Sequence, residues 1–161
     1  MFDFEGHAIK WGQLGAGPPL VLIHGTPFPS QVWRRVLPHL TEYRSIYFYD
    51  LLGYGESEKR VEQDVSLGVQ NRLLAALFKE WRLDRPDVVA HDFGGATALR
   101  AYFLERLRFA SLTIFDAVAL APWGRHSCNM SANTRLHSQA CRIICTAPFW
   151  PRISRLPLTT Q

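Results

Sequence analysis

One acidic residue of this 161-residue chain stands where an apolar strand must turn sharply into a helix. Asp92 lies in the segment VVAHDFGGATALR, with Ala90 two residues before it and Gly94 two residues after it. Small flanking residues let two backbones approach closely, and the residue at such an apex adopts a sparsely populated conformation that exposes its side chain. A carboxylate presented in this way could attack an electrophilic carbon. The alternative is that Asp92 caps the following helix.

Two further loops carry polar residues and glycines directly after apolar runs. His24 and Gly25 begin the segment HGTP, which follows the run LVLI. Asp50, Gly53 and Gly55 belong to the segment DLLGYGES, which follows the run SIYFY. The carboxyl ends of parallel strands gather at one edge of a sheet, and ligands bind outside that edge. We therefore expect the three loops to converge on one cleft.

The elements that must position these loops alternate between strand and helix. The sequence predicts an N-terminal hairpin made of residues 2–4 and 8–14, and buried strands at 20–25, 44–50, 87–91 and 111–120. Helices are predicted at 30–40, 63–82 and 95–107. In the last of these helices, four large residues are expected to face the core: Leu99, Tyr102, Phe103 and Leu107. This alternation indicates an α/β fold with a mostly parallel sheet and an antiparallel N-terminal hairpin.

The composition changes along the chain. All fourteen acidic residues lie within 1–116, whereas 117–161 holds five arginines, all three cysteines and no acid. Only a weak helical period remains there, at 137–145, so we predict a core over 1–124 and an irregular, poorly ordered basic tail over 125–161. His137, Cys141 and Cys145 would share one face of such a helix, but their spacing matches no usual zinc pattern. No metal site and no cofactor is predicted.

The overall composition narrows the possible partners. The net charge of +4 comes without a basic block, so nucleic acid is not an expected partner. No run approaches the roughly 18 apolar residues of a membrane-spanning helix. The opening residues MFDFEGHAIK lack the apolar segment of a secretory signal, which predicts a cytoplasmic protein with no membrane partner. Nothing in the sequence indicates the oligomeric state.

The segments HGTP, DLLGYGES and AHDFGG, in this order and spacing, resemble the α/β-hydrolase superfamily. More narrowly, they resemble its branch with an aspartate nucleophile, as in haloalkane dehalogenases and epoxide hydrolases. The resemblance covers roughly residues 2–124 and implies a small-molecule substrate. It makes Asp92 the nucleophile and the backbone N–H groups of Thr26 and Phe93 the oxyanion donors. The supporting motif residues are His24, Gly25, Asp50, Gly53, Gly55 and Gly94.

The resemblance also implies an acid and a histidine after the nucleophile. Asp116 follows the run SLTIF and matches the place of the acid in some haloalkane dehalogenases; an ordinary acidic residue at a strand end is the alternative. The only histidines further along are His126 and His137, and neither follows a predicted strand. We therefore predict no general base among the six histidines of the chain.

Three hypotheses about function remain. The first is a hydrolase that acts on a small organic electrophile through an alkyl ester on Asp92, which activated water then cleaves. The second is a truncated, non-catalytic fragment that lacks the catalytic histidine, the cap and the final strands. The third is a binding module that keeps the cleft without the chemistry. Thr26 and Phe93 stand where haloalkane dehalogenases commonly have the asparagine and tryptophan that hold halide, so dehalogenation is disfavoured.

Overall fold

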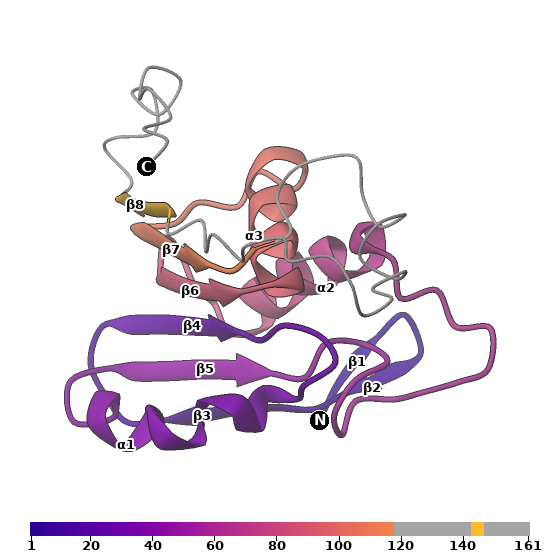
Figure 1. Ribbon diagram of the computed structural model, residues 1–161, viewed down its shortest axis with the longest axis horizontal. Coiled ribbons are helices and arrows are strands. Elements are labelled where there is room, and N and C mark those ends of the chain that lie inside the picture. The colour runs from indigo at the N-terminus through magenta and orange to yellow at the C-terminus, as the bar shows by residue number, and fades with distance from the viewer. Residues whose placement is uncertain (118–142, 147–161) are drawn as a thin grey trace, which may run out of the picture.

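The computed structural model describes residues 1–117 and the backbone of 143–146 (Figure 1). Its main sheet has six strands in the order β3-β5-β4-β6-β7-β8. The four inner strands run parallel, and they are β4 (Pro19–Ile23), β5 (Ser45–Tyr49), β6 (Asp87–His91) and β7 (Ser111–Phe115). The antiparallel edge strands are β3 (Trp11–Leu14) and β8 (Ile143–Thr146). The predicted α/β fold with a mostly parallel sheet is confirmed.

The N-terminal hairpin is confirmed, but its second strand is shorter than predicted. β1 (Phe2–Phe4) pairs with β2 (His7–Ile9), and the chain then enters the main sheet as β3. The break falls at Lys10, whose N–H donates to Ser57 Oγ at 3.0 Å and whose C=O accepts the Asp50 N–H at 2.8 Å. Because the Lys10 backbone is bonded to the loop after β5, a single strand over 8–14 does not form.

Helices cover both faces of the main sheet (Figure 1). They are the 3-10 helix η1 (Ser30–Arg35) and the α-helices α1 (Leu37–Leu40), α2 (Leu67–Glu80) and α3 (Phe93–Leu104). Side chains alternate along a strand, so Val21 and Ile23 join the core under α2 and α3, whereas Leu20 and Leu22 pack with Trp33 of η1. Within residues 1–117 and 143–146, no helix has the length and apolar character needed to cross a membrane.

The helix α3 buries mainly small residues against the core. Three of the four large residues predicted to face inward are partly buried against the same core, as predicted: Leu99, Tyr102 and Leu107. The buried residues of the helix run from Gly94 to Ala98 and include Ala101, whereas the Phe103 side chain is 58% exposed. An α-helix turns about 100° per residue, so Phe103 lies about 200° around the axis from Ala101 and faces away from the core. The prediction that Phe103 packs inward was wrong.

The strand β8 lies in the part of the chain predicted to be irregular. It pairs antiparallel with β7, with Ser111 opposite Thr146. The segment IICT is short, apolar and β-branched, and the free edge of β7 offers backbone donors and acceptors that such a segment can pair with. The expectation of an irregular tail was therefore wrong for 143–146, and the helical period expected over 137–145 was wrong for 143–145. The rest of the tail, and the side chains of the considered metal ligands His137, Cys141 and Cys145, lie outside the described residues.

Candidate active site

Asp92 forms the apex of the turn between β6 and α3. Its backbone has φ 49° and ψ −118°, a combination that non-glycine residues rarely adopt, so the predicted conformation is confirmed. Asp92 occupies the N-cap position of α3, but its side chain makes no capping hydrogen bond there. Only its backbone C=O serves the helix, by accepting the Gly95 N–H at 3.0 Å. The helix-capping alternative for the Asp92 carboxylate was therefore wrong.

The Asp92 carboxylate contacts the loop after β4. Its Oδ2 atom accepts the backbone N–H of Thr26 at 2.9 Å and lies 3.3 Å from the Thr26 hydroxyl. A Cβ atom on Gly25 would lie 2.5 Å from the Asp92 Cβ, and one on Gly94 would lie 2.5 Å from the His24 carbonyl oxygen. The two loops can approach this closely only because both positions are glycine.

Phe93 is the first residue of α3, directly after Asp92. The first N–H groups of a helix have no acceptor within that helix. The Phe93 N–H, at the first position of α3, therefore has no acceptor within the helix, and it belongs to the residue directly after Asp92. The Phe93 C=O accepts the Thr97 hydroxyl at 2.9 Å, so it is occupied within the first turn of the helix.

His24 is fully buried, and both of its ring nitrogens are engaged. Nε2 accepts the Leu51 N–H at 2.8 Å, and Nδ1 lies 2.8 Å from the Gly25 carbonyl oxygen. A nitrogen that accepts from an N–H carries no proton, so Nδ1 carries the single proton and donates it to Gly25. Burial lowers the pKa of His24, and this effect outweighs the opposing hydrogen bonds and the nearby Asp50 carboxylate. His24 is therefore a neutral link between the loops after β4 and β5.

Asp50 lies inside the loop after β5 rather than at its surface. Asp50 as a whole is only 3% exposed to solvent. Oδ1 accepts the Ser30 N–H at 2.6 Å, and Oδ2 accepts the Glu56 N–H at 2.8 Å. Gly55 has φ +56°, and a Cβ on it would collide with the Asp50 carboxylate. Asp50 thus ties the loop to the start of η1.

Gly53 has φ +86°, the left-handed region that glycine adopts without strain.

Within the same loop, the Leu52 backbone is held by Gln70, a residue that the sequence patterns above did not single out. Gln70 is fully buried on α2; its Oε1 accepts the Leu52 N–H at 3.2 Å, and its Nε2 donates to the Leu52 carbonyl at 2.9 Å. The available signal was a polar residue in an apolar row of helix positions, four residues before Leu74 and seven before Leu77.

Asp116 and His91 lie beside Asp92 at the ends of neighbouring strands. The Asp92 N–H donates to the Phe115 carbonyl at 3.2 Å, one residue before Asp116. Asp116 has φ 50°, and its side chain is 54% exposed. Its Oδ2 lies 3.9 Å from Nε2 of His91, whose ring stacks on Phe115 with 4.9 Å between the ring centroids. The structure therefore brings Asp116 to the same sheet edge as Asp92.

Among residues 1–117, no histidine nitrogen is hydrogen-bonded to the Asp92 carboxylate, whose partners are the two Thr26 groups. The two later histidines, His126 and His137, lie outside the described residues. Where the structure describes the chain, no three histidine, cysteine or acidic side chains are grouped as a metal site would need. The described arrangement thus offers a carboxylate with one oxygen held by donors, next to a second acid.

Comparison with known proteins identifies the class of protein. A family model described as the alpha/beta hydrolase family matches residues 20–159. The chain therefore belongs to the alpha/beta hydrolase family. A solved alpha/beta hydrolase fold protein from Burkholderia ambifaria is similar at 58% identity and a TM-score of 0.74, over 76% of this chain and 45% of that one.

Two curated enzymes are also similar to the chain. A soluble epoxide hydrolase of Corynebacterium sp. (strain C12) is 32% identical over 118 residues, which are 71% of this chain and 40% of that enzyme. A haloalkane dehalogenase of Agrobacterium fabrum (strain C58) is 31% identical over 117 residues, which are 73% of this chain and 37% of that enzyme. The chain thus spans about two fifths of the length of the curated relatives it matches.

Proposed function

We propose that this chain carries the nucleophile of a hydrolase that acts on a small organic electrophile, and that Asp92 is this nucleophile. The observation that carries the proposal is the position of Asp92. Asp92 lies at a strained apex between β6 and α3. Its carboxylate accepts the Thr26 N–H and does not cap the helix that follows. Backbone strain persists where the surrounding structure maintains it, and it concentrates at reactive sites. In this proposal the strain keeps the carboxylate at the sheet edge.

The hydrogen bonds assign different tasks to the two carboxylate oxygens. Oδ2 is held by the Thr26 N–H and hydroxyl, so Oδ1 is the oxygen that attacks carbon. Attack forms the Oδ1–carbon bond of an alkyl ester, and the electron pair of the breaking bond stays with the leaving atom. Water then attacks Cγ, and negative charge develops on Oδ2, where the Thr26 and Phe93 N–H groups stabilise it. Collapse breaks the Cγ–Oδ1 bond and leaves the water oxygen on Asp92. One proton of the attacking water goes to the departing Oδ1, which leaves as the alcohol, and the other goes to solvent.

The side chains near Asp92 favour an epoxide over a haloalkane as substrate. A leaving halide needs hydrogen-bond donors that are free to turn toward it. The Thr26 hydroxyl has one proton, which is directed at Asp92, and the Phe93 ring has no N–H or O–H group. In an epoxide the leaving oxygen stays bonded to the substrate, and the alkoxide formed on ring opening can take its proton from water. The similarity to a soluble epoxide hydrolase supports this substrate class.

The alternative function, a non-catalytic fragment, is favoured by one observation. Where the structure describes the chain, Asp92 has no histidine partner that could activate water. A chain without such a base would still form the ester and then stop there, whereas a hydrolase would turn over. Asp116, positioned at the same edge, is the residue we propose as the acid that orients a base.

The test follows the ester on Asp92. The chain is incubated with styrene oxide, and in parallel with 1-bromobutane, and its intact mass and Asp92 peptide are measured in water and in ¹⁸O-water. We expect an adduct on the Asp92 peptide, or, with turnover, incorporation of ¹⁸O into Asp92. Both should vanish in Asp92→Asn and persist in the matched control Asp84→Asn, because Asp84 is an exposed residue paired with Arg108. A folded chain that shows neither adduct nor label with either substrate contradicts the proposal.

A further inference from the structure

The three loops of the site are connected by a chain of buried hydrogen bonds that begins on α2. The Gln70 amide holds both backbone groups of Leu52, at 3.2 Å and 2.9 Å. The preceding residue, Leu51, donates its N–H to Nε2 of His24. Gln70 and His24 are both fully buried, so water does not compete for these bonds. The Asp50 carbonyl, in the same peptide unit as the Leu51 N–H, accepts the Ser57 hydroxyl at 2.6 Å. The Leu51 N–H is therefore held from two sides, by Ser57 and, through Leu52, by Gln70 on α2.

The chain of hydrogen bonds continues from His24 to Asp92. Because Nε2 of His24 accepts from Leu51, its proton is on Nδ1, which donates to the Gly25 carbonyl. The Gly25 carbonyl and the Thr26 N–H belong to one planar trans peptide unit and point in opposite directions. Holding the carbonyl on the His24 side therefore directs the N–H to the Asp92 side, where it meets Oδ2 at 2.9 Å.

We propose that Gln70 is a positioning residue of the active site, which holds His24 in its Nδ1-protonated neutral form and so aims the Thr26 N–H at Asp92. The inference rests on the proposed function for the catalytic meaning of the Thr26 N–H. Gln70 lies on a helix and touches neither substrate nor Asp92; it acts through the Leu52 backbone. Its amide suits this task because it offers one acceptor and one donor to a single residue's N–H and C=O.

Loss of the Gln70 amide has a defined consequence for His24. Without it, Leu52 is released, and only the Ser57 bond to the Asp50 carbonyl still holds the neighbouring Leu51 N–H near Nε2. The charged group facing Nε2 is then the Asp50 carboxylate, whose Oδ1 lies 3.9 Å away and which favours a protonated ring. His91 is the other titratable group that acts on His24, and it opposes protonation. We expect His24 to take up a proton on Nε2 at a higher pH in a Gln70 variant than in the unmodified chain, because the hydrogen bond from Leu51 to Nε2 is weakened while the Asp50 carboxylate remains 3.9 Å away.

The test reads the protonation of His24 directly, in a form that does not depend on turnover. Chain labelled with ¹⁵N-histidine is studied by long-range proton–nitrogen correlation spectra as a function of pH. In the unmodified chain we expect one His24 species, with a proton on Nδ1 and none on Nε2. In Gln70→Leu we expect this signature to be lost, with Nε2 protonated at a pH where the unmodified chain stays neutral, and a shifted Thr26 amide signal.

A neighbouring amide provides the matched control. Asn71 is 2% exposed and also lies on α2, but it bonds to Glu105 and Arg100 of the α3 side rather than to the loop after β5. Asn71→Leu should therefore keep the His24 signature. If Gln70→Leu does not fold, Gln70→Glu replaces it, since it keeps the acceptor for the Leu52 N–H and loses the donor to the carbonyl.

Three outcomes would overturn the positioning role of Gln70, and a fourth would overturn only the proposed function. A proton on Nε2 in the unmodified chain overturns the proposal without any variant. An unchanged His24 signature in a folded Gln70 variant, or the same change in Asn71→Leu, also overturns it. If the His24 and Thr26 signals behave as expected but no ester forms on Asp92, the positioning role stands and the proposed function fails.

Discussion

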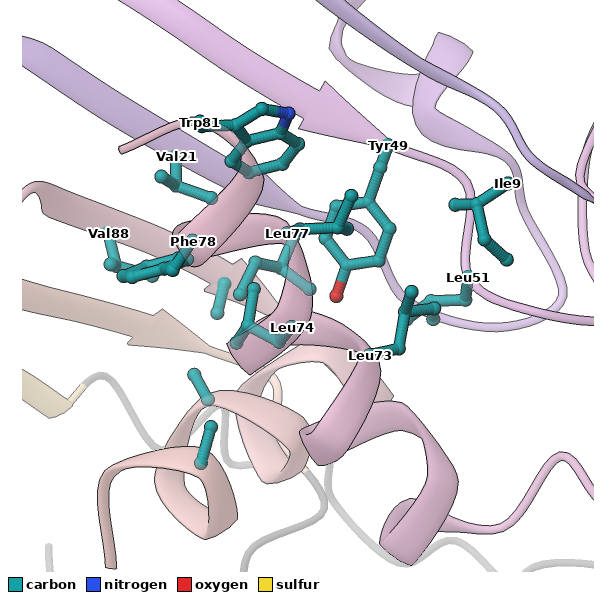
Figure 2. Packing of buried hydrophobic residues seen from close by; sticks show 14 of the residues in the cluster. Ile9, Val21, Tyr49, Leu51, Leu73, Leu74, Leu77, Phe78, Trp81 and Val88 are labelled. Carbon is teal, nitrogen blue, oxygen red and sulfur yellow. The ribbon is translucent and has the colours of Figure 1, made fainter. Parts of the chain in front are cut away.

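Replacing Tyr49 with phenylalanine should make this protein more stable, although it removes a polar group. Tyr49 is fully buried on β5, and its hydroxyl has no hydrogen-bond partner in the described structure. Figure 2 shows this hydroxyl directed into a cluster of leucines, where the ring also packs edge-on against Trp81 with 6.2 Å between centroids. Phenylalanine keeps the ring and its packing and removes only the unpaired oxygen.

The expected gain follows from the cost of burying that oxygen. Burying a hydroxyl without a partner costs about 1–3 kcal/mol. Removing it forfeits a few dispersion contacts, each worth about 0.1–0.2 kcal/mol. The net expectation for Tyr49→Phe is a gain of about 1 kcal/mol in the free energy of unfolding, or about 2–4 °C in Tm for a chain of this size.

Alkaline pH supplies a second, independent part of this prediction. Burial raises the pKa of Tyr49 far above its ordinary value. Above about pH 10 the unfolded chain therefore loses the Tyr49 proton while the folded chain keeps it, so stability falls as pH rises. Tyr49→Phe lacks this group. Its advantage over the unmodified chain should grow by up to about 1.4 kcal/mol per pH unit in that range.

Urea unfolding followed by tryptophan fluorescence and circular dichroism measures both parts. Tyr47→Phe is the control, because Tyr47 also packs against Trp81 but is only half-buried and has no unpaired hydroxyl in the interior. A Tyr49→Phe variant that is less stable than the unmodified chain by about 1 kcal/mol, with a gap that does not change above pH 10, would show that the hydroxyl is hydrogen-bonded and refute the reasoning.

Two further perturbations test the geometry around Asp92. Gly25→Ala places a Cβ 2.5 Å from the Asp92 Cβ and 2.9 Å from Nδ1 of His91, so we expect a loss of about 1–3 kcal/mol in stability and a weakened Asp92 adduct; a variant with unchanged stability and adduct formation contradicts the close approach. Lowering pH through the range below about 6.5 should also destabilise the chain. Burial lowers the pKa of His24, so the unfolded state binds its proton first, and stability should fall by up to about 1.4 kcal/mol per pH unit. Urea unfolding between about pH 6.5 and 5 measures this slope. The control His39→Asn, at an exposed position, should leave the slope unchanged. A stability that does not change with pH in this range would mean that His24 protonates freely in the folded chain.

Local patterns were sufficient to predict the main elements. β6 coincides with the predicted 87–91, and the strand-to-helix apex at Asp92 was predicted from its small neighbours. These features depend on interactions between residues close in sequence, or on the alternation of apolar runs. One error occurred where distant segments compete for the same backbone groups. The strand predicted at 8–14 is interrupted because Lys10 bonds to the loop after β5.

The candidate site shows the same division. The sequence by itself determined the family, the order of the three loops and the position of Asp92, because each motif is contiguous and follows a recognisable apolar run. Only the tertiary structure decided what each polar group does. His24 and Asp50 both follow strands, yet both are buried and bonded to backbone groups of other loops.

The partner of Gln70 could be found only in the folded chain. That partner, Leu52, lies 18 residues away in sequence, and Thr26 and Asp92 are separated by 66 residues. Sequence periodicity shows which side of an element faces inward, but a buried polar side chain is satisfied by whichever backbone group the packing of the sheet and helices brings within about 3 Å. The sequence gives the identity and order of the residues that could do chemistry. Their hydrogen-bond partners depend on how the strands and helices pack, and these partners set the protonation state and orientation of each side chain.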